Sequence, residues 1–562
     1  MRFKRTRSRF KSTRSPALQP GSRQLSCPWP AVCGLTVCGL MLLACLLSLA
    51  QGTAYATSAQ SSDYSRAEAL VRNHQWADGL ALLLPLLKGE PRNLKALNLA
   101  GLAYIGEGDT KQATVYFSRA LTVSPGFVPA LKNLAIGEFN QHQYALAEKH
   151  LLAAAKESPA DPIVNLYLGE VYYGQQKYGP ATARLAEAGP LLSRDSNVAA
   201  HLAISYLRTG EKEKSLAIVD RLDQTQLSPQ SQFALGLALE QTDMPERSVP
   251  YLQAVSRQYP DSYDAGFDLA VTLVVSKQYP ETITIAKAMI ERGQETSELD
   301  NVLAEAYEGD KQTQAAVDAL RRAIALDPND AGNYLDFATL CMNHRAFDDG
   351  LAVVRAGLQV HPTSDRLIFV RGVLYAMQDR FDLAEKDFQE AASLAPQDSY
   401  GYVGLGVTYI ETGNAKQAIQ VLRQRLRDKP DDASLQYLLG EGLLKSGAGP
   451  GDKDYIEAQS ALEKSVRLNP GLCLPHVSLG AIYLREDRLP EAVSQFELAR
   501  TLDPKETSAY SHLAVAYRRL GQADKAREAI ASLKDILEQQ RAGSRERVKS
   551  PTVVATTKGD QP

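Results

Sequence analysis

Residues 94–125 read LKALNLAGLAYIGEGDTKQATVYFSRALTVSP, and this stretch decides the fold. Its two halves carry apolar residues at the spacing of one helix face, and the turn-forming segment GEGD at 106–109 separates them. Pro125 closes the second half, because proline cannot continue a helix. The stretch therefore predicts two amphipathic helices of about a dozen residues, joined by a short turn.

The same pattern recurs along most of the chain with a period of 34 residues. Closing prolines follow this spacing in three series, at 91, 125 and 159, at 328, 362, 396 and 430, and at 470 and 504. The longer gap from 430 to 470 needs one insertion, and we place it in the glycine-rich segment GAGPGDKD at 447–454. A fixed period of this length is typical of repeat proteins that stack helix pairs into a solenoid.

Small and bulky residues occupy fixed places within the repeat. When the closing proline is numbered as place 32, place 8 is Gly or Ala in every unit and place 20 is always small. Place 24 is bulky in most units, as at Phe117, Phe388 and Phe496. Small residues let two helix backbones approach closely, and bulky neighbours fill the space around the contact. The pattern favours paired helices even at 270–279, where AVTLVVSKQY would form a strand by local propensity alone.

A 34-residue helix-turn-helix unit with these residues at these offsets resembles the tetratricopeptide repeat family. The resemblance covers residues 60–540 in about fourteen units, and it implies an all-α fold, a right-handed superhelical α-solenoid. Units near 193, 227 and 294 depart from the pattern because they lack the closing proline. We expect the final helix to cap the stack up to about residue 541, and we expect residues 542–562 to form a disordered tail.

The N-terminal segment has the features of an export signal. Residues 1–30 form a basic region with eight basic residues and no acidic one, and residues 31–50, AVCGLTVCGLMLLACLLSLA, form an uncharged apolar run long enough to span a bilayer. Because the basic residues precede the run, we expect the N-terminus to lie in the cytoplasm and the rest of the chain outside it.

Two fates of residues 31–56 remain open. The sequence Ala54-Tyr55-Ala56 fits the small-x-small motif of signal peptidase, so the segment is either a signal peptide cleaved after Ala56 or an uncleaved single-pass anchor. A lipoprotein signal at Cys45 fits less well, because an apolar residue follows the cysteine. We therefore expect an exported, periplasmic protein, either soluble after cleavage or anchored through residues 31–50.

Composition and motifs exclude several classes of function. Beyond residue 30 the chain holds 54 basic and 65 acidic residues, a net charge of −11, which argues against a nucleic-acid partner. The motifs HExxH, GxSxG and GxxxxGK[ST] are absent, and no His has a Cys or a second His at metal-ligand spacing. The sequence therefore predicts no catalytic residue, no metal site and no cofactor, and we interpret the chain as a protein without enzymatic activity.

In the family that the chain resembles, the first helix of each unit lines a concave groove, chiefly through places 2, 5, 9 and 12. Carried over to this sequence, these places hold a largely apolar set that we predict to bind partners: Phe233, Leu237, Phe267, Val271, Val274, Phe369, Val373, Val403, Val407 and Ile410. An apolar wall suits an extended peptide or an amphipathic helix of another protein. The alternative is that these side chains only pack between neighbouring helices.

The resemblance implies a scaffold for protein–protein interaction, which export would place in the cell envelope. A more specific alternative is a subunit of an envelope assembly that exports or secretes protein or polysaccharide. Self-association is a further open alternative, because apolar repeats also stack end to end.

Overall fold

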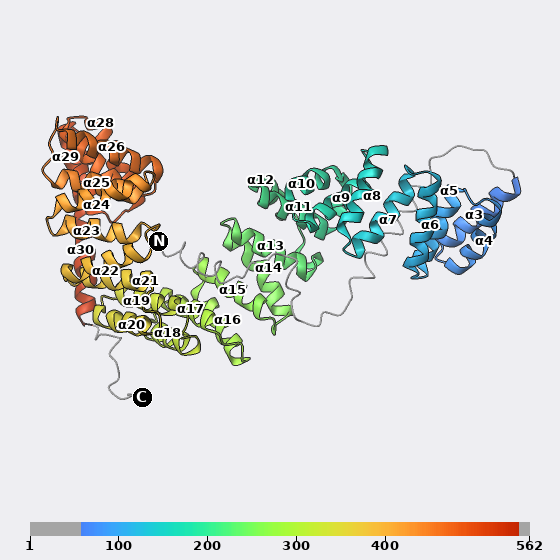
Figure 1. Ribbon diagram of the computed structural model, residues 1–562, viewed down its shortest axis with the longest axis horizontal. Coiled ribbons are helices and arrows are strands. Elements are labelled where there is room, and N and C mark those ends of the chain that lie inside the picture. The colour runs from blue at the N-terminus through green and yellow to red at the C-terminus, as the bar shows by residue number, and fades with distance from the viewer. Residues whose placement is uncertain (1–57, 550–562) are drawn as a thin grey trace. The chain divides into compact units, whose positions relative to one another are not determined.

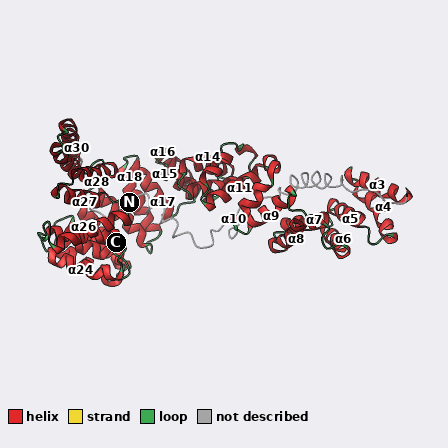
Figure 2. Ribbon diagram, turned by 90° about the horizontal axis from the view of Figure 1, so that it is seen from above, coloured by secondary structure: helices red, strands yellow, loops and turns green. Residues whose placement is uncertain are grey.

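The computed structural model describes residues 58–549, and the chain within this range is built from helices and turns, with no strand (Figures 1 and 2). The chain divides into two compact units, unit 1 up to Gln294 and unit 2 from Glu295 onward. Within residues 58–549, each unit contains seven consecutive helix pairs. The predicted all-α repeat architecture is therefore confirmed, including a helix, α15, over the β-branched segment that begins at residue 270.

The first helices of unit 1 are α3 (Ser58–Arg72), α5 (Leu94–Gly106), α7 (Val128–Asn140), α9 (Pro162–Gly174), α11 (Ser196–Thr209), α13 (Pro229–Gln241) and α15 (Tyr263–Val275). Its second helices are α4 (Trp76–Gly89), α6 (Thr110–Val123), α8 (Tyr144–Glu157), α10 (Tyr178–Glu187), α12 (Lys212–Val219), α14 (Pro245–Gln258) and α16 (Tyr279–Glu291). Short 3-10 helices follow α10 and α12, namely η1 (Gly189–Arg194) and η2 (Gln224–Gln226).

The first helices of unit 2 are α17 (Ser297–Gly309), α19 (Ala331–Asn343), α21 (Asp365–Ala376), α23 (Tyr400–Glu411), α25 (Ala433–Lys445), α27 (Cys473–Arg485) and α29 (Thr507–Arg519). Its second helices are α18 (Thr313–Leu326), α20 (Phe347–Val360), α22 (Phe381–Leu394), α24 (Ala415–Asp428), α26 (Lys453–Leu468), α28 (Leu489–Leu502) and α30 (Ala523–Lys549). The last helix thus runs eight residues past the end that the sequence predicts.

The turn inside each helix pair has one conserved geometry along the chain. In every turn the residue at place 15 has a left-handed backbone, with φ between 56° and 98°. The fourteen residues are His74, Gly108, His142, Gln176, Gly210, Asp243, Lys277, Lys311, Arg345, Asp379, Gly413, Gly447, Asp487 and Gly521. A left-handed residue after a helix reverses the chain direction sharply, which lets the second helix fold back onto the first.

The helices of each unit form two layers. Each first helix contacts the first helix of the next pair in the same unit, so the first helices make one continuous layer. Nearly every second helix packs against its own first helix and against the first helix of the next pair. Around α12 the arrangement differs, because α12 has only 8 residues and makes little contact with α13, the next first helix. In the sequence, this unit is one of those that lack the closing proline, near residue 227.

The closest approach between the two helices of a pair is at places 8 and 24. A Cβ atom added to Gly101 would lie 2.4 Å from the ring of Phe117, and one added to Gly480 would lie 2.6 Å from the ring of Phe496. Each of the three phenylalanines at place 24 faces a glycine in this way, whereas an alanine at place 8 is combined with a smaller residue, as Ala135 is with Leu151. The two places therefore share a limited volume, and the largest residue at place 24 occurs only where place 8 is glycine.

We predict that Gly101→Ala destabilises the protein by about 1 to 3 kcal/mol, because Phe117 is buried and the new methyl group overlaps its ring. In a Phe117→Leu background the same change should cost less, because the pair then matches the natural combination at Ala135 and Leu151. A double-mutant cycle by urea unfolding measures the coupling. Equal costs in the two backgrounds would contradict the shared volume.

One buried arginine breaks the pattern at place 27. Arg425 of α24 is 6% exposed, and its Nε and Nη2 atoms have no hydrogen-bond partner within the described residues. Its guanidinium lies over the ring of Tyr402, 5.0 Å from the centroid, and the nearest carboxylate oxygen, on Asp428, is 3.8 Å from Nη1. Other units have small or apolar residues at this place, such as Ala120 and Ala391. A buried charge is costly when its carboxylate partner is as distant as Asp428 and two of its donors are unsatisfied.

We predict that Arg425→Met raises the free energy of unfolding by about 1 to 2 kcal/mol, because the apolar side chain removes two unsatisfied donors and keeps most of the packing. The matched control is Arg427→Met, two residues along the same helix, where the side chain is exposed and the stability should not change. A destabilised Arg425→Met variant would show that the contact with Tyr402 outweighs the burial cost.

The predicted basic region, the apolar run and the cleavage motif lie outside the described residues, so the export prediction stays a prediction. Within residues 58–549, none of the helices is both long and apolar enough to cross a bilayer.

Candidate functional site

The first-helix layer of each unit is the candidate binding surface. Places 2, 5, 9 and 12 of a first helix recur at three- and four-residue spacing, so they share one face of that helix. We call the face formed by these places along neighbouring first helices the first-helix surface. The residues predicted to bind partners lie on it in both units.

In unit 1, the predicted residues are more buried than an open groove requires. Phe233 and Leu237 of α13 are partly buried against a cluster that includes Leu252 and Leu269. Val271 and Val274 of α15 are 7% and 2% exposed. Phe267 is partly buried, and its ring stacks on that of Tyr263 with the centroids 5.4 Å apart. The structure thus brings the α13 and α15 residues to adjacent helices but leaves little of their surface open.

In unit 2, Phe369 and Val373 of α21 and Val403 and Ile410 of α23 are partly buried against one apolar cluster. The Phe369 ring also packs edge-on against Tyr400, with the centroids 5.1 Å apart. Val407 of α23 is different, because it is 43% exposed. Partner binding by the whole predicted set stays a prediction, and Val407 is its most accessible member.

Sequence reasoning passed over further exposed residues at the same places on later helices. Leu474 of α27 is 46% exposed and Val515 of α29 is 45% exposed, at places 2 and 9. Tyr437 of α25 lies between the flanking helices and packs partly against the apolar clusters on both sides. The signal was available in the repeat frame, but a sequence does not show which apolar side chains at these places remain uncovered.

Acidic groups surround Tyr437. Burial raises the pKa of Tyr437, and the charges of Glu441, Glu506 and Glu411 raise it further. Glu441 accepts a hydrogen bond from the Ser478 hydroxyl on the next first helix, which fixes its carboxylate between α25 and α27. The first-helix surface over α23, α25, α27 and α29 therefore combines exposed aliphatic side chains with the carboxylate of Glu441 at place 9 of α25 and the exposed guanidinium of Arg518 at place 12 of α29.

A polar link joins three successive first helices in unit 1. Nδ1 of His201 on α11 lies 2.9 Å from a carboxylate oxygen of Glu170 on α9, and its Nε2 lies 3.4 Å from the hydroxyl of Ser231 on α13. The imidazole stacks on Tyr173 with the ring centroids 4.1 Å apart. The order carboxylate, imidazole, hydroxyl is that of a nucleophilic triad, but Ser231 is only 3% exposed. The link is suited to hold helices together rather than to attack a substrate.

The electrostatics of His201 favour its charged form. Burial lowers the pKa of His201, but the carboxylate of Glu170, with a smaller contribution from Asp195, outweighs burial and raises it. Elsewhere in residues 58–549, no three His, Cys, Asp or Glu side chains converge as a metal site would require.

Comparisons with known proteins agree with this architecture. Profiles described as tetratricopeptide repeat match residues 64–126, 133–188, 335–399 and 477–541. Further profiles of the same description match residues 230–262, 301–330 and 375–441. Together they cover more than half of the chain.

Cellulose synthase operon protein C of Pseudomonas fluorescens is 24% identical over 443 residues, which are 73% of this chain and 34% of that protein. Type IV pilus assembly protein PilF of Pseudomonas aeruginosa is 31% identical over 189 residues, which are 32% of this chain and 69% of PilF. The chain thus spans only about a third of the length of the first relative. Among solved structures, yeast Tom70 is 16% identical, with a TM-score of 0.38 over 87% of this chain and 99% of Tom70.

We predict that the contribution of His201 to stability depends on pH. Its pKa is raised in the folded state, so its stabilisation is fully present below the unfolded pKa of about 6.5 and is lost as the pH rises through the folded pKa. His201→Gln should therefore cost more stability at pH 5.5 than at pH 8.5, as measured by urea unfolding.

The control is His142→Gln, which changes an exposed histidine in an inter-helix turn where another unit carries Gln176. A loss of stability for His201→Gln that is the same at both pH values would show that packing on Tyr173, not the charge pair with Glu170, makes the contribution.

Proposed function

The chain belongs to the tetratricopeptide repeat family, and from this premise we propose that it is a non-enzymatic scaffold of the cell envelope that binds segments of partner proteins on its first-helix surface. Repeats of this family imply protein interaction. Beyond protein interaction, we propose that the protein is located in the cell envelope and that the first-helix surface binds the partner.

The first-helix surface of α23 to α29 carries the proposal. Val407, Leu474 and Val515 are each more than two-fifths exposed there, and the charges of Glu441 and Glu506 act on Tyr437 in the same part of the unit. Exposed aliphatic groups attract apolar side chains, and the carboxylates favour basic ones. We infer that the partner segment, an extended peptide or an amphipathic helix, carries aliphatic side chains next to Lys or Arg.

Two observations support the envelope location. The basic region and apolar run at residues 1–50 are typical of an export signal or a membrane anchor. Relatives named for cellulose synthesis and for type IV pilus assembly are similar to long parts of the chain. These names also favour the more specific alternative, a subunit of an envelope export or secretion assembly, including one that exports polysaccharide.

We predict that a Val407→Asp, Val515→Asp double variant loses its envelope partner in crosslinking pull-downs from intact cells. Both side chains are 43% or more exposed, so the variant should fold normally. Each substitution removes an aliphatic contact and would place a carboxylate against the apolar side chains of the partner, which is costly. Partner recovery, quantified by mass spectrometry, should fall about tenfold or more, as expected when central apolar contacts are lost.

Val115→Asp is the matched control, because Val115 is 48% exposed but lies on α6, a second helix. A Phe233→Asp, Phe267→Asp variant tests the surface predicted in unit 1, with helicity checked by circular dichroism because both rings are partly buried. Unchanged partners in both double variants would contradict binding on the first-helix surface.

A further inference from the structure

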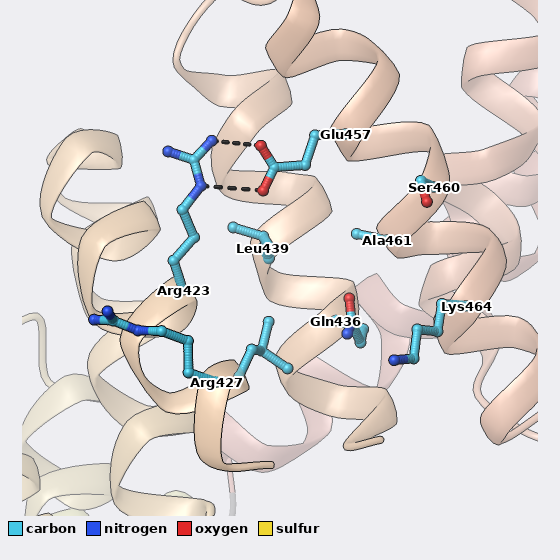
Figure 3. A pocket seen from close by; sticks show the side chains of 9 residues that line it. Arg423, Arg427, Gln436, Leu439, Glu457, Ser460, Ala461 and Lys464 are labelled. Carbon is cyan, nitrogen blue, oxygen red and sulfur yellow. Dashed lines mark hydrogen bonds and ion pairs between the residues drawn. The ribbon is translucent and has the colours of Figure 1, made fainter. Parts of the chain in front are cut away.

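A cavity of about 320 Å³ opens among three helices of unit 2, and neither the repeat pattern nor the proposed function accounts for it. It is lined by α24, α25 and α26, with Leu426, Leu439 and Ala461 as its apolar part (Figure 3). Its α25 residues, Gln436 and Leu439, are at places 4 and 7, not at the places of the first-helix surface. The cavity therefore lies on the second-helix side of the repeat.

The single insertion in the repeat directly precedes α26, one of the helices that line this cavity. The turn from α25 to α26 contains Gly447 and Gly451, both with left-handed backbones at φ 98° and 95°. The Asp452 carboxylate accepts a hydrogen bond from the Gly449 amide at 2.8 Å and holds the longer turn in place just before α26 begins. The first turns of α26 are thereby brought beside α24, where Asp454 and Glu457 both contact Arg423.

Cations line the cavity on several sides. Arg423 binds Glu457 through two hydrogen bonds, with Nε 3.0 Å from Oε1, and this pair joins α24 to α26 at one end (Figure 3). Lys464, on the opposite side, has its Nζ 2.9 Å from an oxygen of Asp431, whose side chain is 72% exposed. Arg427 makes no hydrogen bond or ion pair with any described residue. Arg427 is therefore without a partner among the described residues, and Lys464 is held only by a pair with an exposed carboxylate that a ligand can replace.

We propose that this cavity binds an acidic segment of a partner protein, with a carboxylate on Arg427 and Lys464 and an adjacent aliphatic side chain against Leu426, Leu439 and Ala461. The volume fits one or two side chains and is at the lower end of that of small-ligand sites. The Arg423–Glu457 pair is an example of the contact that we propose for the ligand, because the guanidinium of Arg423 binds a carboxylate through two parallel hydrogen bonds. This acidic ligand differs from the basic, aliphatic segment proposed for the first-helix surface.

The test is binding of a fluorescein-labelled peptide of alternating leucine and glutamate to the full-length protein, measured by fluorescence anisotropy. An Arg427→Ala, Lys464→Ala double variant should bind about tenfold more weakly, because it removes both available cations. The matched control is Lys416→Ala, Arg467→Ala, which removes two exposed cations from the same two helices outside the cavity. It should change the affinity less than twofold.

The outcomes separate the alternatives. Arg427→Lys should restore only part of the affinity lost in Arg427→Ala, because a lysine cannot make two parallel bonds to a carboxylate. Inorganic phosphate that displaces the peptide at equal concentration would overturn the assignment to an acidic protein segment in favour of a free anion. Equal losses in both double variants, or no binding to the native protein, would also overturn it. The Val407→Asp, Val515→Asp variant should bind the peptide normally, so this proposal and the proposed function fail independently.

Discussion

The close contact between places 8 and 24 is the constraint on which the rest of each unit depends. Two helix backbones approach there because place 8 has no side chain or only a methyl group, and the residue at place 24 fills the remaining volume. Phe117, Phe388 and Phe496 all occur opposite glycine, and all three are buried. Once this contact sets the distance within a pair, the next first helix packs into the groove that the pair presents. The layer of first helices follows from repeating this one contact.

Much of the fold can be predicted from the sequence because the repeat is redundant. A frame supported by many units tolerates local exceptions, so the β-branched segment around Val274 is still a helix and the missing prolines do not interrupt the stack. Packing between units is less predictable. The frame identifies Val271 and Val407 as equivalent residues at place 9, yet one is 7% exposed and the other 43%. The difference depends on the side chains of neighbouring helices, which no single repeat specifies.

The candidate sites differ in how they arise from the repeat. The first-helix surface is a property of every unit, and its chemistry varies only through the residues at places 2, 5, 9 and 12. The cavity beside α26 is instead local, because it depends on the particular charged side chains of α24 and α26, such as the pair of Arg423 and Glu457. In the sequence, the insertion shows only as an extended turn. The helix after the insertion keeps its register, since Leu462 at place 24 still packs on Gly440, and which of its polar side chains meet those of α24 is a matter of three-dimensional placement.

The polar link through His201 lies where the repeat is weakest. In a stack of repeats, stability comes mainly from contacts between neighbours, so a short second helix weakens the interface that it would cover. Both second helices around this link are short, since α10 has 10 residues and α12 has 8, and each is followed by a 3-10 helix. Glu170, His201 and Ser231 connect the first helices directly across this region, and Asn197 accepts a hydrogen bond from the Ser228 amide at 2.7 Å. Hydrogen bonds between first helices thus add to the apolar contacts of this region, as the pair of Asn301 and Asn333 does between α17 and α19. Because, against the effect of burial, Glu170 raises the pKa of His201, the link is also sensitive to protonation.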